Sequence, residues 1–222
     1  MKKNMYDCMS HHITSPLLSS LRNLIRKVIC IDTGGYEFAI RVFGRNVFIF
    51  RHNIIMKFAT EGHESIKPPA INASMKKITG ENIDSFRVID SHIEGMKSLL
   101  ENKDGICEAF GLWSDSGEPL AYMWLMYKGG NYGWWHFRNI DAWIFGVFVG
   151  ENHRRKGLCT YMIHRVLNYL HSDKKIDEAY LTVRKGNHSA GNAYEKAGGK
   201  KITHKLTFRI CRINIPFHGH TL

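Results

Sequence analysis

The feature that most restricts the fold of this chain is an apolar strand that runs through a short basic loop directly into a helix. Residues 140–149 are apolar, Arg154, Arg155 and Lys156 follow, and Gly157 precedes a stretch with apolar residues at helical spacing over 158–170. The first N–H groups of a helix lack internal acceptors and carry partial positive charge. The alternative is that the three cations are merely solvated at the start of the helix. Cations are unfavourable there, however, because they face the positive end of the helix dipole. The pattern therefore favours a phosphate-binding turn, which Gly157 lets a ligand approach closely.

A second segment repeats this organisation. Residues 178–184 read as a strand, a polar loop follows, and residues 190–197 read as a short helix. Asn187 in the loop offers both a donor and an acceptor to a ligand that carries amides. Tyr194 lies seven residues later, two helical turns away on the same side of the helix. The segment therefore predicts a second loop that contacts the same ligand.

The remaining pattern predicts an α/β domain preceded by an extension. Strands are expected at residues 75–79, 107–113, 120–127 and 202–213, and a helix at 93–100. Earlier in the chain, an amphipathic helix is expected over 15–30 and a hairpin over 36–50. The helix either packs on the body of the protein or touches a membrane or a partner. Because residues 61–74 read as a linker, we place an extension at 1–72 and the main domain at 73–222.

The net charge and the cysteine content indicate the kind of partner and the cellular compartment, but they do not identify a ligand. The formal net charge of +11 suits nucleic acid, an anionic membrane or a phosphate-rich cofactor. Five cysteines are an odd and sparse set, which predicts no disulfide framework and favours the reducing cytoplasm. No stretch approaches the roughly 20 apolar residues of a membrane-spanning helix, and the N-terminus shows no secretory pattern. The histidines near both termini have too few partners for a metal site, so no metal is expected.

The two loops together resemble a known family. Arg154-x-x-Gly157-x-Cys159 and Asn187-x-x-Ala190-x-x-x-Tyr194-x-x-x-Gly198 are similar to the motifs of the GNAT superfamily of acyl-CoA N-acyltransferases. Cys159 replaces the usual Gly or Ala, and Gly199 replaces the usual Phe. The resemblance covers about residues 73–213. It implies an α/β (α+β) fold with a central mixed, mostly antiparallel twisted sheet flanked by helices.

The resemblance also implies an activity. The expected function is transfer of an acetyl group from acetyl-CoA to a primary amine by direct attack on the thioester. The acceptor is a small molecule, of which an amino sugar is one example, or a protein. The alternative is a nonenzymatic basic module that binds acyl-CoA, nucleic acid or a membrane. We expect a cytoplasmic monomer or homodimer without specific nucleic-acid binding, because no aromatic–basic repeat or DNA-reading motif is present.

Site residues follow from the same resemblance. Tyr194 would protonate the departing thiolate. Histone-type members carry a glutamate at the position of Trp143, and Asp141, two residues earlier on the same strand face, is the candidate base, with His136 as a second. Cys159, at a helix N-terminus, is a position where a lowered pKa is expected, without a covalent role. The residues assigned to the cofactor are Val147, Phe148, Val149, Arg154, Arg155, Lys156, Gly157, Leu158, Cys159, Thr160 and Asn187.

Overall fold

The computed structural model describes the backbone of residues 29–32, 37–42, 45–63, 68–101, 106–129, 131–132, 135–136, 140–210 and 213–218. Side chains are described for residues 51–63, 68–93, 95–101, 106–129 and 140–205. The helix predicted for 15–30 lies outside the described residues except for Ile29 and Cys30. These two belong to strand β1 (Ile29–Asp32), where they pair with Arg41 and Ile40. The end of the predicted helix was therefore wrong, since strand pairing takes over there.

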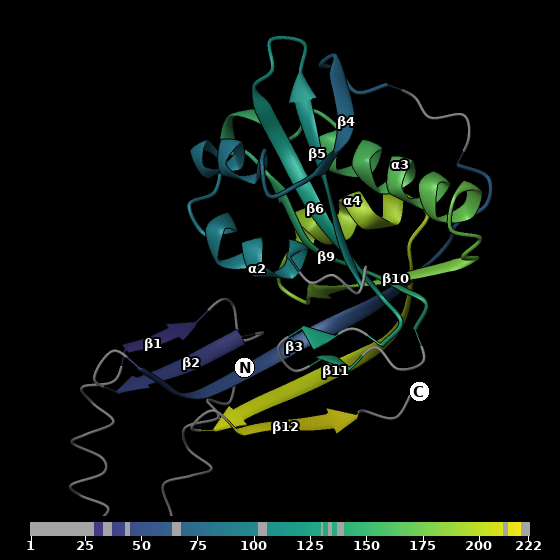
Figure 1. The fold of residues 1–222 in the computed structure, drawn as a ribbon. Helices are drawn as coiled ribbons and strands as arrows, with labels where there is room; N and C mark the ends of the chain where they lie inside the picture. Colours follow the sequence, from purple (N-terminus) through teal and green to yellow (C-terminus); the bar gives the residue numbers. More distant parts are fainter. Residues whose placement is uncertain are drawn as a thin grey trace, which may run out of the picture.

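All the described strands except β7 and β8 form one large sheet, shown in Figure 1. It has ten strands in the order β1-β2-β3-β10-β9-β6-β5-β4, with β11 pairing β3 and β12 pairing β11. Strands β9 and β10 are parallel, and the other pairs are antiparallel. The strand bounds are β2 Glu37–Val42, β3 Arg45–Ala59, β4 Ala73–Ile78, β5 Cys107–Ser114, β6 Pro119–Tyr127, β9 Ala142–Val149, β10 Glu178–Arg184, β11 Lys200–Ile210 and β12 Ile213–His218, while β7 (Asn131–Tyr132) and β8 (Trp135–His136) pair separately.

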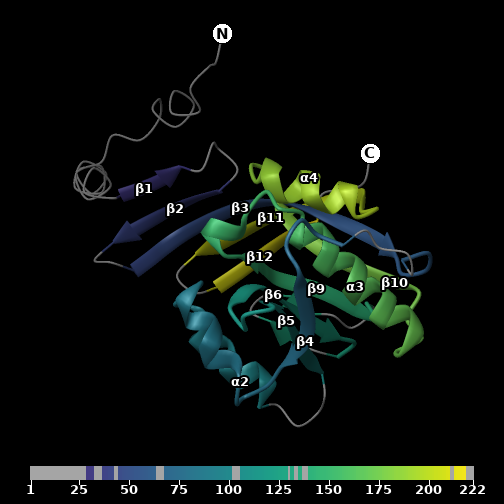
Figure 2. The same cartoon turned by 90° about the horizontal axis from the view of Figure 1, so that it is seen from above.

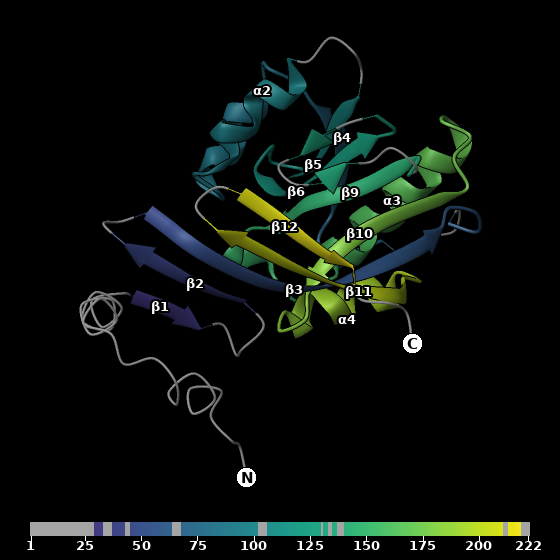
Figure 3. The same ribbon diagram turned by 90° about the horizontal axis from the view of Figure 1, so that it is seen from below.

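Helical segments cover the two faces of the sheet, as Figures 2 and 3 show from above and below. Helices α3 (Leu158–Ser172) and α4 (His188–Lys196) pack on one face. The other face is covered by η2 (Ile83–Val88), η3 (Ile93–Met96) and α2 (Lys97–Leu100). A short turn of 3₁₀ helix, η4 (Glu151–His153), follows β9. This arrangement confirms the predicted mixed sheet flanked by helices. In the part of the chain that the structure describes, no helix combines the length and apolar character needed to cross a membrane.

Strand β3, from the predicted extension, lies inside the sheet of the main domain. It is 15 residues long and forms the predicted hairpin with β2. Its second half pairs with β10 from Asn53 to Ala59, and β11 pairs along its opposite edge from Phe48 to Lys57. Ile54, Met56 and Phe58 are buried in the core with α3 and α4. Residues 45–59 are therefore an integral part of the sheet, whatever the residues before them do.

A half-buried carboxylate joins the strands at the edge of the sheet to α3. Glu108 on β5 accepts hydrogen bonds from Tyr127 of β6 at 2.5 Å, Tyr169 of α3 at 2.9 Å and Lys77 of β4 at 2.9 Å. Lys174, just after α3, donates to it at 3.2 Å. Burial alone would raise the pKa of Glu108, but the hydrogen bonds from Tyr127, Lys77, Tyr169 and Lys174 outweigh it and lower the pKa to about 2.

This carboxylate makes the stability of the protein depend on pH. Because the pKa of Glu108 falls from 4.5 to about 2 on folding, its contribution is complete above about pH 5 and is lost as the pH falls toward 2. Glu108→Gln should lower the free energy of unfolding at pH 7 by roughly 1–3 kcal/mol, and the deficit should shrink by pH 3. Urea denaturation at both pH values measures this. The exposed Glu81→Gln is the matched control; an equal deficit for Glu108→Gln at both pH values would contradict the assignment.

Candidate functional site

Strands β9 and β10 pair only at one end. Their parallel register joins Ala142 to Ala179, Trp143 to Tyr180 and Ile144 to Leu181, and no described pair follows. Beyond Ile144, β9 continues to Val149 with its other edge paired to β6. The backbone N–H and C=O groups of residues 145–149 that face β10 therefore have no ladder partner in the described sheet. Buried or half-buried main-chain groups of this kind require a partner, and an extended amide-bearing ligand is one.

A bulge marks the point where β9 leaves β10. In the register of β6 with β9, Trp124 lies opposite Phe145 and Tyr122 opposite Phe148, so two residues of β9 face one residue of β6. Gly146, one of the two, has a φ of +55°, which glycine adopts without strain. Bulges turn backbone N–H groups away from the ladder and re-aim them. The sequence showed the glycine but not its conformation.

The basic turn after β9 has an irregular backbone with two left-handed residues. After η4, Arg154 is extended, while Arg155 (φ 64°) and Gly157 (φ 81°) are left-handed. Arg154 donates from Nε to the carbonyl of Val149 at 3.3 Å and lies 3.4 Å from Glu151, so its guanidinium is held beside the strand end. A Cβ built on Gly157 meets no atom within 4 Å, which leaves open space above the turn.

Helix α3 begins directly at this turn. Gly157 is its N-cap and offers no side-chain acceptor, so the N–H groups of Leu158, Cys159 and Thr160 are not capped by Gly157. Leu158 is buried in the core, and Thr160 Oγ1 donates to the carbonyl of Ala193 in α4 at 3.3 Å. Burial raises the pKa of the Cys159 thiol to about 12. The expectation of a lowered pKa for Cys159 was wrong, because desolvation disfavours the thiolate at this site.

Asn187 and Tyr194 lie on α4, which packs beside the start of α3. Asn187 is the N-cap of α4 and its Oδ1 accepts from the N–H of Ala190 at 3.2 Å, which leaves its NH₂ group as the side-chain donor. Tyr194 is 6% exposed and belongs to the core between α4 and the sheet. Burial, with a smaller effect from Cys159, raises the pKa of Tyr194, so its phenol stays protonated at neutral pH. The structure thus brings Tyr194 together with the beginning of α3.

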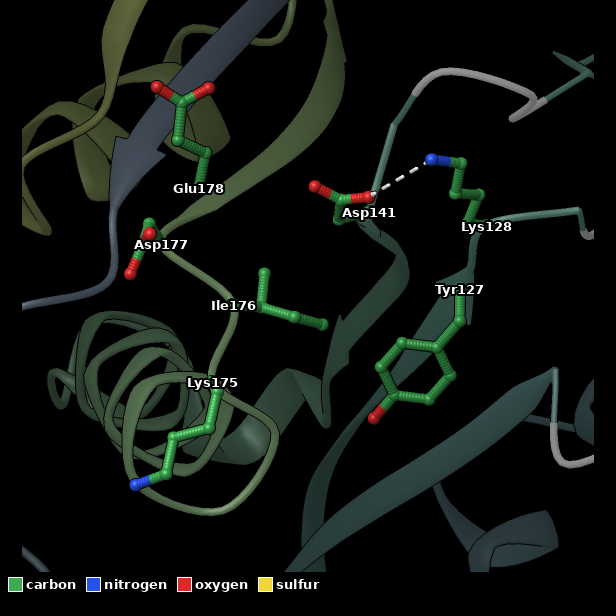
Figure 4. A pocket seen from close by; sticks show the side chains of 7 residues that line it. All are labelled: Tyr127, Lys128, Asp141, Lys175, Ile176, Asp177 and Glu178. Atoms are coloured by element: carbon green, nitrogen blue, oxygen red, sulfur yellow. Dashed lines mark ion pairs between the residues drawn. The ribbon is translucent and has the colours of Figure 1, made fainter.

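Asp141 lies at the other end of this arrangement. It immediately precedes β9 and lines a pocket of about 650 Å³ with residues that follow α3, as Figure 4 shows. Its carboxylate is exposed and lies 3.9 Å from Lys128. Since α3 has 15 residues and is therefore about 20 Å long, the pocket at its C-terminal end is far from Cys159 and Tyr194 at its start. The structure does not bring Asp141 to Tyr194. His136, the second candidate base, lies on β8, and its side chain is outside the described part.

A pair of histidines that the sequence does not predict lies near the basic turn. A pocket of about 370 Å³ is lined by Lys156 and Gly157 of the turn, by α3, and by the connection after β3. Within it, His63 Nδ1 lies 2.7 Å from His164 Nδ1, and His63 Nε2 lies 3.0 Å from the carbonyl of Ala59. The two histidines are 101 residues apart in the sequence, so no local sequence pattern predicts their contact. Among the described residues, no group of three or more metal-ligating side chains is placed to hold an ion.

Comparison with known proteins identifies this architecture. The family model of the acetyltransferase (GNAT) family matches residues 78–199, more than half of the chain. The chain belongs to the GNAT family. The match includes both predicted motifs, β9 with the basic turn, and α4 with Tyr194. The resemblance inferred from Arg154, Gly157, Asn187 and Tyr194 is thereby confirmed for the family.

Relatives of this GNAT are distant. An N-alpha-acetyltransferase of Saccharolobus solfataricus is 32% identical over 76 residues, which cover 31% of this chain and 46% of that protein. The chain therefore spans about half the length of this curated relative. A tandem GNAT protein from the clavulanic acid biosynthesis pathway superposes with a TM-score of 0.53 and 11% identity over 90% of this chain and 59% of that one. A functionally unknown conserved protein of Staphylococcus epidermidis superposes with a TM-score of 0.52 and 13% sequence identity. The match covers 89% of this chain and 67% of that one. These structures share the fold.

The raised pKa of the half-buried Cys159 thiol can be tested by alkylation. With a pKa of about 12, the thiol holds roughly a thousandth of the thiolate of an ordinary cysteine at pH 8. Iodoacetamide should therefore label Cys159 in the folded protein at least about 100-fold more slowly than in guanidinium, as measured by mass spectrometry of peptides. Equal rates in the two conditions would show that the thiol is accessible and ionised.

Proposed function

We propose that this GNAT transfers an acetyl group from acetyl-CoA to a primary amine. The observation that carries the proposal is the gap between β9 and β10, which opens beyond Ile144 and Leu181 and leads to the basic turn before α3. An extended thioester with a charged pyrophosphate at one end has matching features: amides for the free strand edge and phosphates for the turn. The open space over Gly157 and its left-handed backbone fit close approach of such a group.

Different groups of the chain would bind different parts of acetyl-CoA. The free edge of Val147, Phe148 and Val149 would pair with the amides of the pantetheine arm, as a further strand does. The turn residues Arg154, Arg155 and Lys156 would surround the pyrophosphate, and the N–H groups of residues 158–160 would point at it. The NH₂ group of Asn187, free of the helix cap, would donate to a carbonyl of the arm.

Tyr194 would act when the amine has attacked the thioester carbonyl. The tetrahedral intermediate collapses by breaking its C–S bond, and the sulfur requires a proton or a strong hydrogen bond. The raised pKa of Tyr194 keeps its phenol neutral and therefore able to donate. The N–H groups at the Gly146 bulge would polarise the carbonyl before attack. The proton that the attacking nitrogen loses balances the one that the thiolate gains.

The acceptor is proposed only as a class. The relative from Saccharolobus solfataricus is an N-alpha-acetyltransferase by name, which supports an α-amine of a peptide or an amino-acid derivative as the first acceptor to test. A small amine such as an amino sugar is the second. Asp141 remains a prediction as the base; ordered water is the alternative route for the proton, and Asp141→Asn belongs in the same kinetic series.

Cofactor binding is tested at the turn. Gly157→Glu places a carboxylate where the pyrophosphate is proposed, and it should weaken CoA binding by about 10- to 100-fold, the equivalent of roughly 1.5–3 kcal/mol for one charge-assisted bond. Calorimetric titration with CoA measures this. Gly129→Glu is the matched control, because Gly129 is also left-handed with open space but lies after β6, at the other end of β9. Equal CoA affinity of the two variants would contradict the proposal, as would nucleic-acid binding without CoA binding.

The role of Tyr194 is tested by removing its hydroxyl. Tyr194→Phe should lower kcat by roughly 10²- to 10⁴-fold, the usual contribution of general acid catalysis, while CoA affinity stays within a few fold. Steady-state kinetics with acetyl-CoA and an accepted amine measure the effect. Tyr161→Phe, on α3, is the matched control. A kcat within about twofold of the parent would assign the proton to water or to another residue.

A further inference from the structure

A buried indole beneath Gly146 of β9 has an unused hydrogen-bond donor. Trp124 on β6 is 0% exposed, and its Nε1 has no hydrogen-bond partner among the described residues. Buried side-chain donors are nearly always paired, and tryptophan N–H groups usually find an acceptor when they are buried. An unpaired donor of this kind therefore points to a partner that the described residues do not supply, such as a bound ligand.

Its position connects it to the site. Trp124 lies opposite Phe145 at the bulge of β9, and its indole packs against Gly146. A Cβ built on Gly146 would lie 2.8 Å from Trp124 Cδ1 and 3.6 Å from Nε1, so the donor lies directly beneath the glycine. Gly146 itself is exposed. The donor is thus one layer of atoms below the surface where β9 separates from β10.

A flexible side chain lies next to the same spot. Met96, at the junction of η3 and α2, places its Cε 3.6 Å from the position of a Gly146 Cβ. Methionine has three rotatable bonds and changes rotamer at low cost. A small rotation of Met96 would therefore uncover the strip between Gly146 and the indole without a change in the backbone.

The face of the sheet on which Trp124 lies determines whether its indole N–H faces the cofactor or the acceptor. Helices α3 and α4, with the basic turn and Tyr194, pack on one face, and Trp124 with Met96 belongs to the other. If the thioester occupies the gap, the amine must approach its carbonyl from the face that α3 and α4 leave free. An indole N–H is a hydrogen-bond donor only, so it cannot bind a protonated amine. It requires an acceptor, such as an oxygen atom close to the reacting nitrogen.

We propose that Trp124 Nε1 recognises a carbonyl oxygen next to the acceptor's amine, as in an aminoacyl group, and that Met96 covers this donor until the acceptor binds. The inference rests on the proposed acetyl transfer, because it places the thioester beside Gly146. It makes Trp124 a specificity-determining residue on β6. It also separates acceptors that carry a carbonyl beside the nitrogen from simple alkylamines.

The first test uses the indole signal itself. Trp124→Phe assigns the Trp124 indole among the ¹H–¹⁵N signals, and the parent protein is saturated with CoA and titrated with L-alaninamide or isopropylamine. L-alaninamide should move the Trp124 indole proton downfield, and isopropylamine, which lacks the oxygen, should not. An equal response to both amines, or none to either, would overturn the proposal. CoA binding is measured first by calorimetry, so its failure would instead refute the proposed function.

A second test uses discrimination between the two amines. Trp124→Phe should lower kcat/KM for L-alaninamide by about 5- to 10-fold, the effect of one neutral hydrogen bond, and change that for isopropylamine by less than about twofold. Trp113→Phe on β5 is the matched control. An equal loss for both amines would show a structural role only. If Trp124→Phe does not fold, Met96→Ala replaces it. Loss of the Met96 side chain should speed the exchange of the Trp124 indole proton with water, which assigns that signal. The titration with L-alaninamide and isopropylamine is then carried out on the Met96→Ala variant.

Discussion

The parallel contact between β9 and β10 ends after three residue pairs, and the arrangement of the site depends on that early end. Two parallel strands that stayed together would satisfy each other's backbone and leave no edge for a ligand. Because β9 bulges at Gly146 and keeps its pairing to β6 alone, one main-chain edge stays available beside the basic turn. The free edge, the turn and the start of α3 therefore form one continuous surface rather than separate binding features.

Much of this surface could be predicted, because its residues are close in sequence. Gly157 sits between a strand and a helix, and three consecutive cations precede it, so local rules for helix starts suffice. Tyr194 follows from its spacing to Asn187 on a single helix. Most strand and helix positions of the main domain were also confirmed, since apolar periodicity decides them. The strand expected over 202–213 is instead two strands, β11 and β12, and the helix expected over 93–100 is 3₁₀ up to Met96 and α-helical from Lys97.

What the sequence could not supply depends on contacts between distant segments. The hydrogen-bond donors to Glu108 come from β4, β6 and α3 and from Lys174, two residues after α3. The pair of His63 and His164 spans 101 residues. The strand face of Asp141 was read from alternation, but alternation says nothing about which end of β9 meets the cofactor. Likewise, the left-handed φ of Gly146 and the unpaired indole of Trp124 exist only in the packed sheet.

The insertion of β3 between β10 and β11 has a consequence for how the molecule assembles. The family match begins at residue 78, yet a strand made much earlier separates two strands that are made more than 100 residues later. That strand can pair early with β2, but the parts of its edges that face β10 and β11 stay unpaired until those strands have been synthesised. Such long-range pairing slows folding and exposes an edge to other chains in the meantime. A fragment cut to the limits of the family match would lose this strand and leave β10 with an open edge.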